Sequence, residues 1–472
     1  MDLAIPPFEP PAPIPRTVPP GRLEVIRTVF RNPLELWGEA SYTLPWIDTR
    51  FFGRRSLIVN HPGLIRHLLV DNASNYKMQN VRQLVLRPIL RDGLLTAEGL
   101  VWKRTRKAIA PVFTPRHAKG FATQMYAKSI DFVEESYFGA DATGLPRDIS
   151  VDMAQMTFAI LSETLFSGEI AVSEETFSRD TENLLHFMGR IDPMDLMEAP
   201  SWVPRVTRIG GGPVMAKFRD IVKNTIDMRR RRVAADPANA PQDFLTLMLA
   251  LIDTDSGLTE DELQDNILTF IGAGHETTAR ALAWTLYCVA NTPSVREAME
   301  DEIDRVLAEA VDPVDWLESM PHVRAAFEEA MRLYPPAPSI NRQAVKADSW
   351  TSPEGEVVEI PAGVTVLIMP WTLHRHELLW EEPRLFRPER FLPENRGKID
   401  RFQYLPFGAG PRVCIGATFA LQEAVIALGV LMHRYRFDPL PGFRPWPVQR
   451  LTVQPIKGMP MRVTPRAAKQ AL

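Results

Sequence analysis

The sequence predicts a protein that is mainly α-helical with small β-sheets. Segments with apolar residues at helical spacing recur along the chain of 472 residues, for example at 243–253, 321–334 and 420–435. The strand candidates are few, and they lie near the N-terminus and after residue 340. The regular alternation of strands and helices that is typical of a parallel-sheet enzyme is therefore not expected.

The elements follow one another in a clear order. The first 30 residues are dense in proline, which favours an extended arm over a helix. Residues 56–70 predict a short strand, a turn and a helix, and residues 357–369 predict strand structure around a turn. The longest helix is expected at 259–290, where a threonine followed by three acidic residues favours a helix start.

Composition excludes several classes of protein. The net charge of −4, from 54 basic and 58 acidic residues, argues against a general nucleic-acid binder. Two cysteines exclude a disulfide framework and indicate a reducing cytoplasm. No apolar run reaches the ~18–20 residues of a membrane span, and the N-terminus lacks a signal pattern. We therefore expect a cytoplasmic protein.

The segment LPFGAGPRVCIG (405–416) places Cys414 in a loop rich in glycine, directly before an amphipathic helix. A helix start and loop amides are expected to lower the pKa of the thiol. A free cysteine is often only a small buried hydrophobe, but the glycines allow close approach of a bulky, flat group. With no second cysteine and no histidine close to it in the sequence, zinc is disfavoured, whereas a single axial sulfur on haem iron fits.

This loop resembles the haem-binding signature of the cytochrome P-450 family, Phe-x-x-Gly-x-Arg-x-Cys-x-Gly, at every fixed position. The resemblance implies that Cys414 is the ligand of the iron of haem b. It also implies cofactor contacts from four further residues of the loop: Phe407, Gly408, Arg412 and Gly416.

The long predicted helix contains IGAGHETTARA (271–281). Its two interior glycines each cost roughly 1 kcal/mol relative to alanine, which leaves a simple helix kink as one interpretation. A phosphate-binding loop is disfavoured because no strand precedes it. The segment resembles the family's oxygen-binding motif, which implies room for O₂ at Ala273 and Gly274 and a proton relay through Glu276 and Thr277.

Three further motifs resemble the family. Glu329 and Arg332 are spaced to pair on one helix face, and the family's Glu-x-x-Arg pair is locked to an arginine that matches Arg390; we expect a structural role for these three. The remaining cofactor candidates resemble residues that bind the haem propionates: Trp102, Arg106 and Arg342, together with Arg412.

The ordered motifs span residues 102–416 and so cover most of the chain. The resemblance implies the cytochrome P-450 fold, with haem buried between the long central helix and the helix after the Cys loop. It also implies a proline-rich arm and lead-in at residues 1–45 and a catalytic domain at residues 46–472.

The expected activity is that of a haem-thiolate monooxygenase, which inserts one oxygen atom of O₂ into a C–H bond of a hydrophobic small molecule. Fatty acids, terpenoids, steroids and aromatics are all reasonable substrates. The candidates for the pocket lining are apolar: Val81, Leu84, Val85, Leu94, Phe187, Met188, Ala273, Ile340 and Met459.

The chain ends soon after the Cys-loop helix, so we expect electrons from a separate ferredoxin-type or flavodoxin-type donor with its reductase. Lys103, Arg104 and Lys107 would form part of the dock for an acidic partner, or simply a solvated basic face. The protein is expected to be a monomer. Two rival functions are a peroxide-driven peroxygenase and a non-catalytic haem sensor; retention of Glu276 and Thr277 disfavours both.

Overall fold

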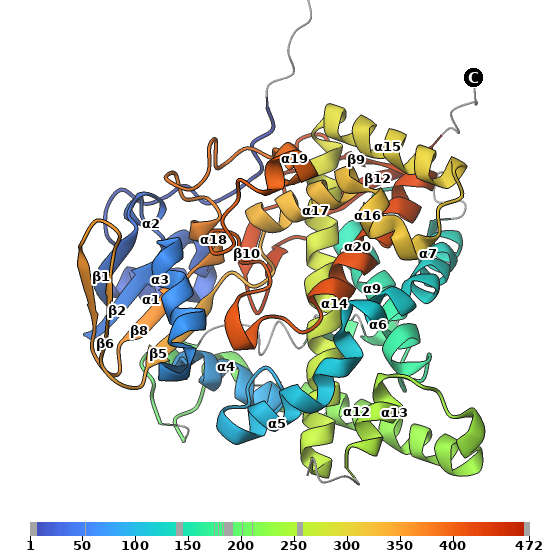
Figure 1. The fold of residues 1–472 in the computed structure, drawn as a ribbon, viewed down its shortest axis with the longest axis horizontal. Helices are drawn as coiled ribbons and strands as arrows, with labels where there is room; N and C mark the ends of the chain where they lie inside the picture. Colours follow the sequence, from blue (N-terminus) through green and yellow to red (C-terminus); the bar gives the residue numbers. More distant parts are fainter. Residues whose placement is uncertain are drawn as a thin grey trace, which may run out of the picture.

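A computed structural model describes residues 7–51, 53–137, 145–173, 175–177, 179–181, 183, 192–200, 202–209, 211–252 and 258–466. Figure 1 shows a sheet at one side of the molecule and a larger helical body at the other, with the helix α14 (Glu260–Ala290) running through the middle. The prediction of a mainly helical protein with small sheets is confirmed.

The central helix α14 has 31 residues and begins with a capping box. The hydroxyl of Thr259 accepts a hydrogen bond from the Glu262 amide at 3.2 Å, and the Glu262 carboxylate accepts one from the Thr259 amide at 2.8 Å. These contacts satisfy amide groups that a helix start leaves without partners. The long helix predicted for residues 259–290 is confirmed.

Three helices that carry or flank the motifs pack around α14: α9 (Ile149–Phe166), α17 (Pro321–Leu333) and α20 (Ala417–Arg434). Both α9 and α20 are buried over most of their length. The other helices are α1 (Arg22–Arg31), α2 (Ala40–Thr43), α3 (Pro62–Arg66), α4 (Asn80–Leu90), α5 (Gly99–Ile109), α6 (Pro115–Gly120), α7 (Ala122–Tyr137), α11 (Pro193–Leu196), α12 (Gly211–Ala235), α13 (Phe244–Ala250), α15 (Pro293–Ala308), α16 (Trp316–Ser319), α18 (Pro370–Leu373) and α19 (Pro393–Arg396).

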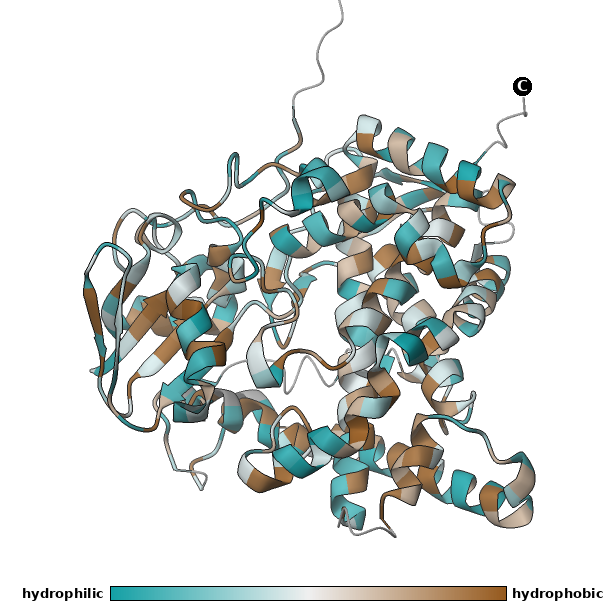
Figure 2. Ribbon diagram, viewed as in Figure 1, coloured by the Kyte–Doolittle hydropathy of each residue, from teal (hydrophilic) through white to brown (hydrophobic). Residues whose placement is uncertain are grey.

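The largest sheet has five strands in the order β1-β2-β8-β5-β3. Only the pair β2–β8 is parallel, and it joins the two ends of the chain in one sheet. Alternate residues of this sheet belong to one buried hydrophobic cluster, and Figure 2 shows many hydrophobic residues along its strands. The strands are β1 (Trp46–Phe51), β2 (Arg54–Val59), β3 (Tyr76–Met78), β5 (Ile340–Ala344) and β8 (Thr365–Ile368).

Three smaller sheets complete the described part of the chain: β4 (Arg147–Asp148), β12 (Pro460–Pro465) and β9 (Tyr435–Pro439) form one, β10 (Pro447–Gln449) and β11 (Val453–Pro455) a second, and β6 (Asp348–Thr351) and β7 (Val357–Ile360) a third. The strand structure predicted at 357–369 is confirmed, but its two strands do not pair with each other. β7 pairs with β6, whereas β8 lies in the five-stranded sheet.

The N-terminal arm differs in part from the expectation. Its first described residues are not helical, but α1 begins at Arg22. The prolines end at Pro20, so nothing prevents a helix in the next ten residues. The arm packs on the body: the Tyr334 hydroxyl donates to the Pro11 carbonyl at 2.8 Å. In the described part of the chain, no helix is both long and apolar enough to cross a membrane.

Candidate active site

The Cys loop is a tight turn that ends where α20 begins. The Cys414 amide donates to the Phe407 carbonyl at 2.8 Å and closes the turn. Gly408 and Gly410 both have φ of +72°, a conformation that strongly favours glycine. A Cβ on Gly410 would lie 1.7 Å from the carbonyl oxygen of Leu69, so the loop packs directly against the backbone at Leu69 and Val70.

The sulfur of Cys414 is accessible although protein atoms surround it, and the accessible space beside it is called the recess below. Its side chain is exposed, yet protein atoms crowd it enough to shift its titration. Burial raises the pKa of the thiol and outweighs the Gly416 amide, which hydrogen-bonds the sulfur, and the charge of Arg106, both of which lower the pKa. The expected lowering by loop amides is therefore present but is not the dominant effect. A strong cation at the sulfur would reverse the balance.

Two arginines and a tryptophan meet beside the Cys loop. The Arg412 guanidinium lies over the Trp102 ring at 4.6 Å from its centroid, and it donates to the Ala97 carbonyl at 2.8 Å. It also pairs with Glu98 at 2.9 Å. Arg106 lies one turn further along α5, within the electrostatic reach of Cys414, and burial lowers its pKa. The structure thus brings three of the four propionate candidates together.

The fourth candidate, Arg342, lies on β5 and is only 8% exposed. Its guanidinium donates to the Asn341 carbonyl at 3.1 Å. At the start of the same strand, Ile340 reaches to 3.8 Å from a Cβ built on Gly408, so β5 borders the Cys loop. Phe407 is half-buried and packs on the main core.

The middle of α14 has a short exposed stretch. Gly272 and Ala273 are exposed although the helix is buried for most of its length. The Thr277 hydroxyl, on the same face one turn later, donates to the Ala273 carbonyl at 2.8 Å. Gly274 faces another way: a Cβ there would lie 2.2 Å from Leu161 of α9, so this glycine permits close helix packing.

Glu276 is held in a buried ion pair. Its carboxylate accepts from Arg280 at 2.8 Å and from the Thr452 hydroxyl at 3.1 Å. Burial raises the pKa of Glu276, but the charge of Arg280, aided by His275 and by these hydrogen bonds, brings the pKa below its usual value. At neutral pH the group is therefore a carboxylate that is already paired.

Glu423 on α20 was not found by sequence reasoning. Its side chain is 1% exposed, and neither carboxyl oxygen has a hydrogen-bond partner among the described residues. Burial raises its pKa well above the usual value of 4.5, and the hydroxyl of Thr278 on α14 opposes this with a smaller effect. The only signal in the sequence is one acidic residue within the apolar run ALQEAVIALGVL.

The three residues assigned a structural role form one cluster, as expected. Glu329 and Arg332 are fully buried and pair at 2.7 Å, and Arg390 lies 3.4 Å from the same carboxylate. The Arg332 guanidinium also donates to the carbonyls of His374 and Pro383 at 2.6 and 2.7 Å. The cluster therefore ties α17 to the segments that precede the Cys loop.

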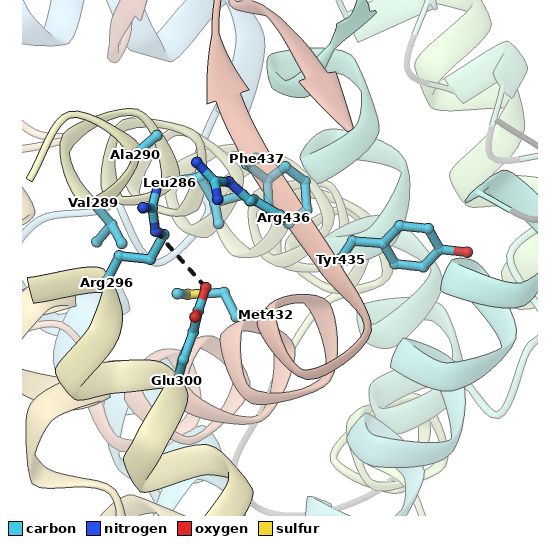
Figure 3. A pocket seen from close by; sticks show the side chains of 9 residues that line it. All are labelled: Leu286, Val289, Ala290, Arg296, Glu300, Met432, Tyr435, Arg436 and Phe437. Atoms are coloured by element: carbon cyan, nitrogen blue, oxygen red, sulfur yellow. Dashed lines mark ion pairs between the residues drawn. The ribbon is translucent and has the colours of Figure 1, made fainter. Parts of the chain in front are cut away.

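The predicted lining residues fall into four groups. Val81, Val85, Leu94, Ile340 and Met459 are buried, Leu84 is partly buried, Ala273 is exposed, and Phe187 and Met188 lie outside the described residues. A separate pocket of about 10 Å³ (Figure 3), room for one water, lies at the C-terminal end of α14. Arg296 and Glu300 line it, and so does Met432, which lies at the end of α20 far from Cys414.

The residues of the recess fit an iron porphyrin. An accessible sulfur is a suitable soft ligand for iron. Arg106 and Arg412 place two cations near it, which suits two propionates, and the glycines at 408 and 410 let the loop backbone turn without side chains in the way. The exposed stretch of α14 at Gly272 and Ala273 carries no bulky side chain. A mainly helical fold with these features defines a haem-thiolate protein.

The chain belongs to the cytochrome P450 family, whose model matches residues 43–462. It is 30% identical to cyclooctatin synthase of Streptomyces melanosporofaciens over 94% of this chain and 95% of the relative. It is 26% identical to LUTEIN DEFICIENT 5 of Arabidopsis thaliana over 88% of this chain and 71% of that protein. A crystal structure of the cytochrome P450 CYP102L1 matches with a TM-score of 0.78, 26% identity, and coverage of 97% of this chain and 100% of that one. The protein is a cytochrome P450 monooxygenase, an oxidoreductase with haem b as its cofactor.

Proposed function

We propose that this monooxygenase inserts one oxygen atom of O₂ into a C–H bond of a hydrophobic small molecule, with electrons from a separate ferredoxin-type or flavodoxin-type donor. The observation that carries the proposal is the accessible sulfur of Cys414 beside Arg106 and Arg412. The apolar character of the predicted lining residues supports a hydrophobic substrate such as a fatty acid, terpenoid, steroid or aromatic.

The residues take the following roles in this proposal. Cys414 holds the iron, and haem b supplies the activation of O₂, which a thiolate ligand favours by donating electron density. The Gly416 amide bonds the sulfur and tunes its basicity. Trp102, Arg106, Arg342 and Arg412 bind the propionates, and Phe407 and Gly408 border the ring.

On the opposite side, Ala273 leaves room for O₂ and Gly274 sets the approach of α14 to α9. The Thr277 hydroxyl donates to the Ala273 carbonyl, so its oxygen can still accept a hydrogen bond from a proton donor. Glu276 is ionised and paired with Arg280; in the relay it positions Thr277 and water rather than giving up a proton of its own.

A separate electron donor would approach the side of α5. Lys103 and Lys107 are exposed there, whereas Arg104 pairs with Glu262 and adds less to the surface charge. An acidic donor would be steered by these cations, and its reduction of the protein would slow as salt rises. The expected monomeric state and the cytoplasmic location stay predictions.

The proposal is tested on the purified haem-loaded protein. We expect Cys414→Ser to lose the red-shifted Soret absorption that a thiolate gives to the reduced carbonyl complex. Cys288→Ser is the matched control, because Cys288 is a fully buried cysteine of α14 remote from the recess. Retention of that absorption in Cys414→Ser contradicts the ligand assignment. Parallel turnover with O₂, donor and reductase, and with peroxide alone, separates a monooxygenase from a peroxygenase.

A further inference from the structure

A buried histidine links the cluster of Glu329, Arg332 and Arg390 to the start of the Cys loop. His374 directly follows α18 and is fully buried. Its ring Nε2 lies 2.8 Å from the amide nitrogen of Leu405, the first residue of the Cys loop. Its ring Nδ1 lies 3.3 Å from the Arg332 carbonyl oxygen. One imidazole therefore bonds both the end of α17 and the loop that carries the cysteine.

The two partners determine the protonation state of the ring. A backbone amide only donates, so Nε2 is the acceptor and carries no proton. The Arg332 carbonyl only accepts, so the proton of the neutral ring lies on Nδ1. Burial, together with the charges of Arg332 and Arg375, lowers the pKa of His374 well below its usual value and keeps the ring neutral. A charged ring would direct an N–H at the Leu405 amide and lose that bond.

Arg332 holds His374 from a second side. The Arg332 guanidinium donates to the His374 carbonyl at 2.6 Å, while the His374 ring donates to the Arg332 carbonyl. Glu329 pairs with the same guanidinium, so this reciprocal contact belongs to the buried cluster. The ring of Tyr404 lies on the loop side, with 5.2 Å between the two ring centroids. The imidazole is therefore fixed in place before it meets Leu405.

The Leu405 peptide is the first fixed point of the Cys loop. Its carbonyl accepts from the Gly408 amide at 3.2 Å, and the Phe407 carbonyl accepts from the Cys414 amide at 2.8 Å. Leu405 is 2% exposed and packs in the hydrophobic cluster of the five-stranded sheet. If the ring of His374 were lost, this buried amide would lose its acceptor, which is costly. The turns of the loop would then form from a peptide that is no longer held.

We propose that His374 is a positioning residue of the haem-thiolate centre, whose neutral ring holds the Leu405 amide and thereby sets where the sulfur of Cys414 meets the iron. The inference rests on the proposed role of Cys414 as the iron ligand. His374 acts through the backbone of the loop and takes no part in the reaction itself. A merely stabilising residue would change the free energy of unfolding alone, whereas a positioning residue also changes the sulfur–iron bond.

The first test compares two amide side chains that each reproduce one half of the ring. His374→Gln places an oxygen near the Nε2 position and keeps an acceptor for Leu405, whereas His374→Asn places an N–H near Nδ1 and keeps only the bond to Arg332. The readout is the red-shifted Soret absorption of the reduced carbonyl complex of the haem-loaded protein. We expect His374→Asn to lose this absorption about tenfold faster than the parent, the factor for one lost hydrogen bond. His374→Gln should behave as the parent does. Equal lifetimes in the two variants overturn the inference.

Tyr404→Phe is the matched control. Tyr404 precedes Leu405, and its hydroxyl donates to the Glu328 carbonyl at 2.8 Å, so this variant also loses one buried hydrogen bond of the same segment. It should lower the urea midpoint as His374→Asn does, but it should leave the lifetime of the absorption at the parent value. An equal loss of lifetime in Tyr404→Phe would make His374 a purely structural residue and overturn the inference.

A second measurement does not depend on whether His374→Asn folds. The reduced carbonyl complex is diamagnetic, and NMR of protein labelled with ¹⁵N in histidine shows the tautomer of each ring. The ring that is missing from His374→Gln is His374. We expect its Nδ1 to carry the proton and its Nε2 to accept a hydrogen bond. A proton on Nε2 overturns the inference whatever the variants do, whereas a parent without the thiolate-type absorption overturns the proposed function instead.

Discussion

The guanidinium of Arg412 stacks on the indole ring of Trp102, with 4.6 Å between Cζ and the ring centroid. The two residues come from distant parts of the sequence, one from the Cys loop and one from α5. The stack, the hydrogen bond to the Ala97 carbonyl and the ion pair with Glu98 hold Arg412 in one place. Burial partly desolvates the cation before any anion binds, and this desolvation lowers the pKa of Arg412.

Replacement of Arg412 is expected to weaken haem binding. Arg412→Ala loses the stack and a cation at the recess, and we expect a loss of roughly 2 kcal/mol, or about 30-fold, in hemin affinity. Hemin titration of the apoprotein measures it. Arg412→Lys keeps the charge but loses the planar guanidinium, so its hemin affinity should lie between those of the parent and Arg412→Ala. Arg116→Ala, an exposed arginine on α6, should bind as the parent does. Equal affinity of Arg412→Ala and the parent would contradict a propionate role.

The Thr277 hydroxyl should govern how dioxygen is used. Thr277→Ala removes the hydroxyl beside the Ala273 carbonyl, so proton delivery fails and more NADPH is consumed for peroxide. We expect a rise of several-fold in peroxide per NADPH, measured with a ferredoxin and its reductase. Thr277→Ser retains the hydroxyl and is the matched control. An unchanged ratio in Thr277→Ala rules out the relay role.

The buried Glu329 cluster should be a major source of stability. Glu329→Ala leaves Arg332 as a fully buried cation without its carboxylate, which costs about 3–5 kcal/mol. Urea unfolding followed by circular dichroism measures the change. Glu389→Ala is the control in the same region, because Glu389 pairs with Arg387 at the surface and should contribute at most ~1 kcal/mol. Similar urea midpoints for Glu329→Ala and Glu389→Ala would contradict a stabilising role of the buried cluster.

Glu423 should make stability depend on pH. Below pH 4.5, the usual pKa of this side chain, the folded and unfolded protein both hold its proton. As the pH rises above 4.5 the unfolded chain releases the proton and the folded protein keeps it. The free energy of unfolding therefore falls, by about 1.4 kcal/mol per pH unit, until the folded carboxyl titrates. Glu423→Gln should gain in melting temperature relative to the parent across this window; a constant difference would show that the folded pKa is not raised.

Much of the fold follows from local sequence. The long helix at 259–290 was predictable because its capping threonine and acidic first turn act within a few residues. The end of the N-terminal arm was misjudged because proline density was extended past Pro20. The pairing of the strands at 357–369 could not be read locally, since their partners lie far away in the chain.

The site was predictable where a motif is contiguous and unpredictable where contacts are distant. The Cys loop and the order of the motifs gave the family and the residues around Cys414. The hydrogen bond from Thr452 to Glu276 depends on a contact across 176 positions. The charge of Arg280, which does most to keep this carboxylate ionised, lies only four residues further along the same helix. The isolation of Glu423 depends on what is missing around it in three dimensions, which no spacing in the sequence encodes.

The contact between Gly410 and the Leu69 carbonyl has a consequence for biosynthesis. Leu69 belongs to the hydrophobic cluster of the five-stranded sheet. This sheet contains β2 from the start of the chain and β8 from its last third, so neither half of the chain can form it alone. A ribosome must release most of the polypeptide before the cysteine turn finds the surface that shapes it. Porphyrin binding is thereby deferred to a late stage of maturation, and truncated translation products would be unable to bind the porphyrin.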